Sequence, residues 1–565
     1  MKKLFLILVL LSALLASRWL FKPGYFNMHD DLQMMRQLQM EKCWQDNQFP
    51  CRWVPDMGFG YGYPLFNFYP PLPYYVGQIF RWLGLTFMTT AKVIFALQFF
   101  LSGVTMFILA ADLWGDWGGL LSAVFYIWAP YHAVDVFVRG ATNEAWAFIW
   151  FPLIFWAGKK LVEKEKWRYV FWLALGYGSL LLTHSIMALI FTPAFLAWIA
   201  YWLVIEKKYS WRKGRLWGQL TLSGIWALGL SAFFTLPMLF EKEFTHIETM
   251  FSGYFDWRAH FVSIKQLFLT RFWGWGPSLW GAEDGMPFPV GHFHWILGLL
   301  VFLLVVFSIA QKFFLKKKGR IKNQALLLMG LFLGGLAYAF LAHQRSVFLW
   351  RIIKPLQLAQ FPWRLLAGCV FFFSLLAGSV WQLVKSYWLI IVLGLGVIVF
   401  NWSFFQPESM GPLTDEQKFS GRAWEYQQTA GLYDYLPISA RIAPRSAPKT
   451  DWLMIGKGES SGGKWEKGTN WARWQGKVEK PGTIQASIFY FPGWRAWVDG
   501  KEVEIGHDEE LGRMQIKLEA GERQIDFRFV NTPIRSWANF FSLFSWWALL
   551  GVAMGPSLWQ LIPKN

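Results

Sequence analysis

"MHDDLQMMRQLQMEKCWQDNQFPCRWVPDMGFGYGYPLFNFYPPLPYYVG" runs from Met28 to Gly77 and follows directly on an apolar N-terminal segment. It places two adjacent carboxylates, Asp30 and Asp31, just beyond the expected first helix. A loop rich in Tyr, Pro and Gly comes next. What this loop can do depends on where it lies, and the rest of the chain decides that.

The composition indicates a membrane protein. Of 565 residues, 55% are hydrophobic and 16% are charged, whereas a soluble domain carries about 25% charged residues. Many apolar runs reach the roughly 20 residues that a helix needs to cross a bilayer. The sequence therefore predicts a polytopic α-helical membrane protein.

The net charge of +18 is concentrated in short loops between apolar runs. These loops are "KKLVEKEKWR" from Lys159, "EKKYSWRKGR" from Glu206 and "QKFFLKKKGRIKN" from Gln311. Such clustering is typical of cytoplasmic loops under the positive-inside rule. The pattern argues against nucleic acid as a partner and for contact with membrane lipids.

Apolar runs predict about twelve transmembrane helices, beginning on the cytoplasmic side because of Lys2 and Lys3. The expected spans are Leu4–Leu20, Thr90–Ala111, Trp117–Phe137, Ala145–Leu161, Tyr169–Thr183, Ala188–Ile205, Leu216–Phe240, Phe293–Ala310, Gln324–Ala342, Trp363–Leu383, Tyr387–Phe404 and Ala538–Ile562. The first run also has a weak signal-peptide site at "LLASRW", but we prefer a retained helix that anchors the loop.

The basic loops fix the sidedness of the acidic pair. All three loops lie in the cytoplasm only if Pro70–Gly84 does not cross, and this segment is short and begins with prolines. We interpret it as an interfacial or re-entrant helix. Asp30 and Asp31 then face the extracytoplasmic side, and both termini are cytoplasmic, as expected for a protein of the bacterial cytoplasmic (inner) membrane.

Three regions follow from this topology. Residues 1–405 form a transmembrane domain whose first outer loop is 21–89, residues 406–537 a polar extracytoplasmic block, and residues 538–565 a last helix. The block alternates around the turn signals Pro492-Gly493, Asp499-Gly500 and Ala520-Gly521, which predicts a small antiparallel β-sandwich. It either has a purely structural role or contacts a glycan or partner.

Cysteine placement agrees with an outer first loop. Cys43 and Cys51 flank "WQDNQFP", and an oxidising compartment permits a bridge between them. Two free thiols are the alternative. Cys369 lies within a predicted span and is interpreted as an inert apolar residue.

Four motifs in register then carry a family resemblance. They are "GYGYPLFNFYPPLPYY", "RGATNEAWAFIWFPL", "LAQFPWRLL" and "YFPGWRAWVDG". With the acidic pair they resemble the GT-C superfamily of membrane glycosyltransferases, in a layout similar to aminoarabinose and protein-mannosyl transferases. Within it, the chain most resembles the bacterial membrane family catalogued as 6-pyruvoyl-tetrahydropterin synthase-related. Many relatives have Asp-Glu or Asp-His where this chain has His29-Asp30-Asp31, which leaves open which carboxylate is primary.

The resemblance implies transfer of a sugar from a polyprenyl-phosphate donor to an extracytoplasmic glycan, lipid or protein. Asp30 is the candidate general base, with Asp31 and Glu144 as further candidates, because a carboxylate in a partly desolvated cleft can accept a proton. Alternatively, Asp30 caps the following helix and Asp31 lies in its first turn. Arg36 and Glu41 are expected on the exposed face of that helix.

Candidate binding residues surround these carboxylates. The sugar cleft would be lined by Arg52, Trp53, Tyr61, Tyr63 and Tyr69, which could equally form an interfacial aromatic belt. Arg139 either contacts substrate or pairs with Glu144. The phosphate would be held by Arg345, Arg351, Lys354 and Arg364, whose alternative role is headgroup contact. Pro362 is expected to start a helix and to present Arg364 near the surface.

Histidines complete the candidate set. His292 and His294 form the one close pair, with His184 and His260 as possible additions. A metal centre needs three or four ligands, so we expect His184 and His292 to contact structure or substrate. No metal site or cofactor is assigned, although a divalent cation is compatible with the chemistry.

Two functions of different classes remain. One is a lipid-phosphate-dependent glycosyltransferase, and the other is a non-catalytic scaffold or lipid-linked glycan carrier. Replacing Asp30 by Asn separates them, because an enzyme loses turnover and a scaffold does not. The enzyme reading also predicts that the first outer loop, the Arg139–Glu144 turn and the Arg345–Arg364 loop meet at one place.

Overall fold

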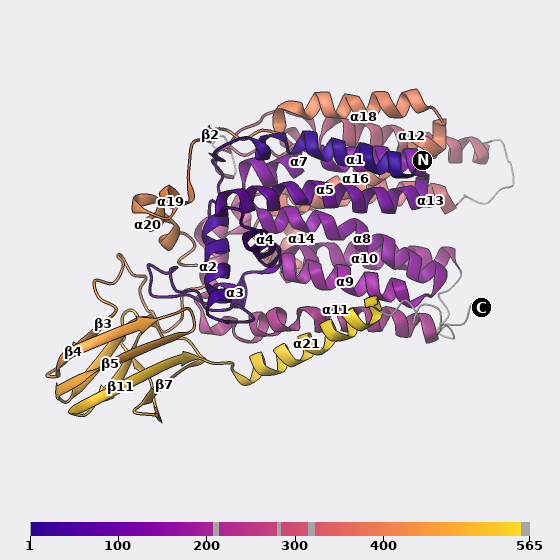
Figure 1. The fold of residues 1–565 in the computed structure, drawn as a ribbon. Coiled ribbons are helices and arrows are strands. Elements are labelled where there is room, and N and C mark those ends of the chain that lie inside the picture. The colour runs from indigo at the N-terminus through magenta and orange to yellow at the C-terminus, as the bar shows by residue number, and fades with distance from the viewer. Residues whose placement is uncertain (1, 207–213, 280–283, 315–322, 555–565) are drawn as a thin grey trace.

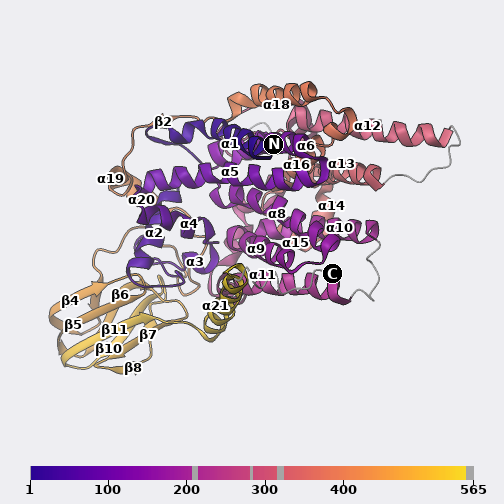
Figure 2. The same cartoon turned by 45° about the vertical axis from the view of Figure 1, so that its right-hand side comes forward.

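The computed structural model describes residues 2–206, 214–279, 284–314 and 323–554. A bundle of long helices forms the larger part, and a β-sandwich is attached at one end of it in both views (Figure 1 and Figure 2). The last helix, α21, leads from the sandwich back along α11, where the Trp226 indole donates to the Ser545 carbonyl at 3.0 Å. The helix that leaves the sandwich is thus packed against the bundle.

Twelve elements make up the long helices of the described bundle. They are α1 (Lys2–Ala16), α5 (Phe87–Trp114), α6 (Asp116–Ile127), α8 (Thr142–Lys164), α9 (Trp167–Thr183), α10 (Ser185–Ile205), α11 (Gly214–Phe240), α12 (His292–Phe314), α13 (Asn323–Ala342), α16 (Leu366–Ala377), α18 (Tyr387–Asn401) and α21 (Pro533–Met554). Their shared core is aromatic and aliphatic, with Phe99, Tyr126 and Phe371 fully buried.

Eight described helices are long and apolar enough to cross a membrane, or nine if the bent pair Asp116–Ile127 and Pro130–Val138 counts as one span. The predicted count of about twelve is therefore not confirmed. One reason is length, because α1 and α9 have 15 and 17 residues, fewer than the roughly 20 that crossing requires. The basic loops after Glu206 and Gln311 and the end of the last predicted span lie partly outside the described residues.

Short elements connect the long helices. Those before α12 are η1 (Arg18–Phe21), β1 (Tyr25–Phe26), α2 (Gln33–Gln45), α3 (Leu65–Phe68), α4 (Leu72–Trp82), α7 (Pro130–Ala133), η2 (Val134–Val138), η3 (Lys242–Phe244), η4 (Ile247–Phe251), η5 (Gly253–Phe255), η6 (Trp257–Ala259) and η7 (Lys265–Leu269). Those after α13 are η8 (Gln344–Ser346), α14 (Val347–Ile352), α15 (Lys354–Gln357), η9 (Pro362–Leu365), α17 (Val380–Val384), η10 (Trp402–Phe404), β2 (Met410–Gly411), α19 (Asp415–Lys418) and α20 (Gly421–Thr429).

The first outer loop contains two of the expected local features. Cys43 and Cys51 form a disulfide with Cα atoms 5.5 Å apart, so the predicted bridge is confirmed. Helix α4 falls within the Pro70–Gly84 segment and has 11 residues, too few to span a bilayer. Its placement at a membrane interface stays a prediction.

The sandwich consists of two antiparallel sheets between Trp452 and Phe529. One has the order β3-β6-β10-β9 and the other β4-β5-β11-β7-β8. The strands are β3 (Trp452–Ile455), β4 (Glu459–Lys467), β5 (Trp471–Lys480), β6 (Gly482–Phe489), β7 (Trp494–Val498), β8 (Lys501–Val503), β9 (Gly506–His507), β10 (Arg513–Leu518) and β11 (Gly521–Phe529). Asp499 and Gly500 join β7 to β8 with φ of 49° and 79°, as a tight hairpin turn requires.

Residues 406–451, here called the linker segment, precede the sandwich instead of belonging to it. Strand β2 of this segment pairs with β1, matching Gly411 to Tyr25. The Asp415 carboxylate accepts hydrogen bonds from the first backbone N–H groups of α5, at 2.7 Å from Phe87 and 3.0 Å from Met88. The predicted polar block is thus two parts, and the first of them is tied to the first outer loop.

Candidate functional site

Asp30 is held by the helix that follows it. One of its carboxylate oxygens, Oδ2, accepts hydrogen bonds from Arg36 Nη1 at 2.7 Å and from Gln33 Nε2 at 3.1 Å. Leu32 occupies the N-cap position of α2 and Asp30 caps no backbone N–H, so the capping alternative is wrong. The Asp30 side chain is 34% exposed, which leaves it accessible to a substrate.

Arg36 is buried, and the expectation of an exposed position is wrong. Its guanidinium lies over the Tyr69 ring, 4.1 Å from the centroid. Burial is the largest single effect and lowers the pKa of Arg36, but Asp30, Tyr69 and Tyr74 together outweigh it, and the pKa is raised well above its ordinary value. Glu41, also expected to be exposed, is ion-paired with Arg81 at 2.5 Å.

Asp31 contacts a different part of the molecule. Its carboxylate accepts a 2.5 Å bond from Lys418 Nζ of the linker segment, and it precedes α2 instead of lying in the first turn. Burial raises the pKa of Asp31, while Lys418 acts in the opposite direction. The two carboxylates of the acidic pair therefore have different partners: Asp30 contacts α2, and Asp31 contacts the linker segment.

The backbone around Asp30 is fixed against the turn before α8. The Asp30 N–H donates to the Arg139 carbonyl at 2.8 Å, and the His29 N–H donates to Val138 at 3.1 Å. Gln33 Nε2 reaches the Gly140 carbonyl at 2.8 Å. Two segments that the sequence analysis expected to meet are thus in direct contact.

A buried ion cluster lies behind this contact. Glu144 Oε2 is 2.8 Å from Arg139 Nη1 and 3.2 Å from Arg364 Nε, and its side chain is 1% exposed. Arg139 also pairs with Asp135 at 2.5 Å. The alternative that Arg139 pairs with Glu144 is therefore confirmed, and the Arg345–Arg364 loop joins the cluster through its last residue.

Arg364 does not lie near the surface as expected. Its side chain is 10% exposed and donates to the Ala359 carbonyl and to Gln360, both at 2.9 Å. Pro362 does start the helical run Pro362–Val384, as expected, and Arg364 lies in its first turn, η9 (Pro362–Leu365). That turn directs the guanidinium inward to Glu144.

The aromatic residues that were predicted to line the sugar cleft lie in two different places. Tyr69 lies at Arg36, and the Tyr63 hydroxyl donates to the Gly431 carbonyl of the linker segment. Trp53 instead packs on the sandwich, 5.6 Å from the Trp494 ring, and Tyr61 stacks on Phe489 at 5.1 Å. These two aromatic side chains therefore fill the contact between loop and sandwich.

Arg52 lies in another buried polar cluster, close to α21. It donates to Asn67 at 3.2 Å and to Asn539 at 2.7 Å. Burial and the neighbouring Arg535 lower the pKa of Arg52 to about 9. Glu241 and Arg535 pair in the same cluster at 2.9 Å, which makes this a structural junction of the loop, α11 and α21.

The histidines do not assemble into a metal centre. His184 accepts a hydrogen bond from the Met187 N–H at the start of α10. His292 donates to the Leu269 carbonyl at 3.4 Å, whereas His294 is buried against Phe125. Among the described residues, no group of three His, Cys, Asp or Glu side chains is placed to hold a metal ion.

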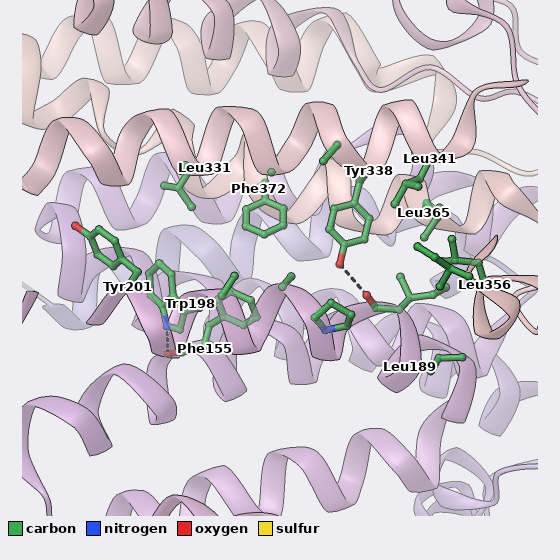
Figure 3. Close-up of a pocket in the computed structure, with 18 of the residues that line it drawn as sticks. Phe155, Leu189, Trp198, Tyr201, Leu331, Tyr338, Leu341, Leu356, Leu365 and Phe372 are labelled. Carbon is green, nitrogen blue, oxygen red and sulfur yellow. Dashed lines mark hydrogen bonds between the residues drawn. The ribbon is translucent and has the colours of Figure 1, made fainter. Parts of the chain in front are cut away.

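An apolar cavity of about 410 Å³ lies between α10, α13, α15 and α16 (Figure 3). Ile190, Tyr338 and Phe372 line it. Its polar groups include the Tyr338 hydroxyl, which donates to the Ile190 carbonyl at 2.8 Å, and the Trp198 indole, which donates to the Phe155 carbonyl at 2.8 Å. Leu189 and Ile353 on its rim are 38% and 45% exposed. The cavity therefore opens sideways through an apolar surface.

Cationic residues border this cavity. Lys354 stands between the lining residues Ile353 and Pro355, and Arg364 precedes the lining residue Leu365. Lys354, Arg345 and Arg351 are exposed. Lys354 and Arg364 are therefore chain neighbours of lining residues but do not themselves line the cavity.

Sequence reasoning missed Asp434, which the linker segment brings to Asp30. It is half-buried, and burial raises its pKa to about 7, with Arg36 opposing the shift and Asp30 adding to it. A usable signal is its setting in "GLYDYLP", a lone acid between two tyrosines. For Arg36 and Gln33, the signal is their spacing of three residues on one helix face after Asp30.

Comparisons with known proteins give no family. No family model matches the chain. An uncharacterized protein of Lactococcus lactis subsp. cremoris (strain MG1363) is 25% identical over 242 residues, which are 42% of this chain and 39% of that protein. The cryo-EM structure of the arabinofuranosyltransferase AftD from mycobacteria is similar at 12% identity and a TM-score of 0.41, over 74% of this chain and 28% of that one. The matched regions are less than half of the length of the Lactococcus protein and of AftD. At this level of similarity they carry no argument about function.

Proposed function

We propose that this chain is a membrane glycosyltransferase that moves a sugar from a polyprenyl-phosphate donor to an extracytoplasmic acceptor. The observation that carries the proposal is the Asp30 carboxylate. One of its oxygens is fixed by Arg36 at 2.7 Å, and the other, Oδ1, has no hydrogen-bond donor among the described residues. A positioned and accessible carboxylate of this kind can accept the proton of an incoming nucleophile.

The donor would occupy the apolar cavity with part of its tail. The volume of about 410 Å³ is within the usual range of ligand sites, about 300–1,000 Å³. Lys354 and Arg345 would hold the phosphate, because cations bind phosphate oxygens strongly. Arg364 is engaged by Glu144 at 3.2 Å, so it would contact the phosphate only by exchanging part of that pairing.

The transfer is balanced as follows. Asp30 takes the proton of an acceptor hydroxyl or amine, whose oxygen or nitrogen forms the new bond to the anomeric carbon. The bond from that carbon to the phosphate oxygen breaks, and the lipid phosphate leaves with the electron pair. Glu144 is a positioning residue in this scheme, because it fixes Arg139, whose carbonyl holds the Asp30 N–H.

The proposed orientation places this chemistry outside a bacterial cytoplasmic membrane. Helix α8 has 23 residues and therefore a length of about 34 Å, comparable to the bilayer core. The Glu144 cluster is at its first turn and the basic Lys159–Lys164 stretch at its last. Under the positive-inside rule, the basic end is cytoplasmic, as are the chain termini, and the Asp30 site and the sandwich are extracytoplasmic.

The test is a transfer assay with the full chain in nanodiscs. Radiolabelled sugars on polyprenyl phosphate are offered as a panel, with envelope glycans, lipids and proteins as acceptors. Asp30→Asn is expected to lower turnover about 10²- to 10⁴-fold. Asp526→Asn, a carboxylate paired with Arg473 on the sandwich surface, is the matched control and should keep activity.

Two outcomes count against the proposal. If Asp30→Asn retains wild-type turnover with every active donor, Asp30 is not the base. If no donor of the panel supports transfer, the chain is not an enzyme of this class, and the scaffold or carrier reading takes its place.

A further inference from the structure

The linker segment covers the Asp30 side of the first outer loop. It is fastened there at separate points: β2 pairs with β1, Lys418 with Asp31, and the Phe59 N–H donates to the Gln428 carbonyl at 3.1 Å. The Tyr63 hydroxyl donates to the Gly431 carbonyl and accepts from the Tyr435 N–H at 3.2 Å. The segment is thus a fixed wall of the site.

Asp434 is placed by a tight turn in this wall. Its N–H donates to the Gly431 carbonyl at 3.0 Å. Gly431 has a φ of +71°, and a Cβ there would lie 3.1 Å from the Asp434 carboxylate and 3.9 Å from Leu32. A side chain at position 431 would therefore be strained and would press between Asp434 and the residue that follows the acidic pair.

The Asp434 carboxylate has no hydrogen-bond or ion-pair partner among the described residues. The charged groups that face it are Arg36 and Asp30, and these two are already paired with each other at 2.7 Å. Tyr63 and Tyr435 are its titratable neighbours. The Asp434 oxygens are not among the fully buried polar atoms that lack a partner, so they are open to solvent and can accept hydrogen bonds from a donor supplied from outside.

We propose that Asp434 binds the acceptor at the Asp30 site by accepting hydrogen bonds from its O–H or N–H groups, which makes the linker segment part of the substrate-binding surface. This inference rests on the proposed transfer function. It assigns the acceptor side of that site, whereas Lys354 and the apolar cavity belong to the donor side. Hydroxylated and amino sugars share the required chemistry.

The proposal predicts separate kinetic effects for the two carboxylates. Asp434→Asn should raise the KM for the acceptor about 10- to 100-fold, since a hydrogen bond to a charged group is lost, and leave the KM for the donor unchanged. Asp30→Asn should instead lower kcat. Glu425→Gln, an exposed acid of the same segment, is the matched control and should behave as wild type.

The pH dependence gives a second readout. Only the ionised form of Asp434 accepts hydrogen bonds with both oxygens, so kcat/KM for the acceptor should rise with pH through about 7. The Asp434→Asn variant should lose this rise, and Asp434→Glu should restore part of it. A variant profile identical to wild type, with unchanged KM for the acceptor, overturns the proposal.

A labelling experiment covers the case of variants that fail to fold. A hydrophobic carbodiimide with a tagged amine modifies protonated carboxyl groups, and peptide mass spectrometry locates the tag on the wild-type chain in nanodiscs. Asp434 should be labelled at pH 6, spared at pH 8, and protected at pH 6 by methyl glycosides or by glucosamine, which distinguishes neutral from amino-sugar ligands. Labelling that neither probe reduces overturns the proposal. Because this readout needs no turnover, its failure is distinguishable from failure of the transfer function.

Discussion

Replacing Glu144 by Gln removes the carboxylate that Arg139 and Arg364 share. Breaking a buried ion pair by removing one partner costs about 3–5 kcal/mol. Arg139 keeps Asp135 at 2.5 Å, whereas Arg364 keeps just neutral partners, the Ala359 carbonyl and Gln360. We therefore expect a loss near the lower limit, about 3 kcal/mol, caused mainly by the stranded charge of Arg364.

Reversible unfolding of the purified chain in mixed detergent micelles measures this loss. Adding Arg364→Met to Glu144→Gln should recover part of the stability, since both buried charges are then absent. Glu241→Gln is the matched comparison, because Glu241 is 2% exposed and paired with Arg535 at 2.9 Å, away from Asp30. It should destabilise similarly and spare the site.

The reasoning is refuted in either of two ways. A Glu144→Gln variant within about 1 kcal/mol of wild type would mean that the cluster does not depend on this carboxylate. A double variant less stable than the single one would mean that the stranded arginine is not the cause.

Two further outcomes concern the outer part of the chain. The raised pKa of Asp434 means that the folded state prefers its neutral form, so this residue's contribution to stability is lost as the pH rises from 3.8 to about 7. The stability of Asp434→Asn relative to wild type should therefore increase by about 2 kcal/mol from pH 4 to pH 8, allowing for partial solvent contact. Chemical unfolding at the two pH values measures this change, and the same stability difference at both would contradict it. Cys43→Ser should lower the free energy of unfolding by about 2–3 kcal/mol through loss of the disulfide. If adding a reductant leaves the unfolding midpoint of the wild type unchanged, the bridge does not stabilise the loop.

Local features were predictable because short spacings determine them. The Cys43–Cys51 bridge, the short helix α4 and the Asp499-Gly500 turn each depend on a few neighbouring residues. The roles of the aromatic residues, in contrast, could not be predicted from the sequence. Trp53 and Tyr69 lie in one loop, yet Trp53 packs on the sandwich and Tyr69 on Arg36, and the sequence does not distinguish a core ring from a cleft ring.

The site itself required contacts between distant segments. Arg36 is buried because Asp30 and Tyr69 close over it, which no helical periodicity of α2 indicates. Asp434 reaches the site because the linker segment turns back onto the first outer loop. Arg364 turns inward because Glu144 compensates its charge. Each of these pairings is made by tertiary structure. The sequence predicted that the first outer loop and the segments of Arg139–Glu144 and Arg345–Arg364 meet, but not which side chains pair there.

Native mass spectrometry of the purified chain with added polyprenyl phosphate tests the lipid-linked donor most directly. Gly330 lines the apolar cavity, and a Cβ there meets no atom within 4 Å. Gly330→Phe should therefore occupy part of the cavity and weaken binding at least tenfold. Gly394→Phe is the control, because Gly394 on α18 is equally open but lies outside the cavity. We predict that the wild type and Gly394→Phe retain polyprenyl phosphate and that Gly330→Phe does not. No retention by the wild type, or equal retention by the two variants, would contradict the account.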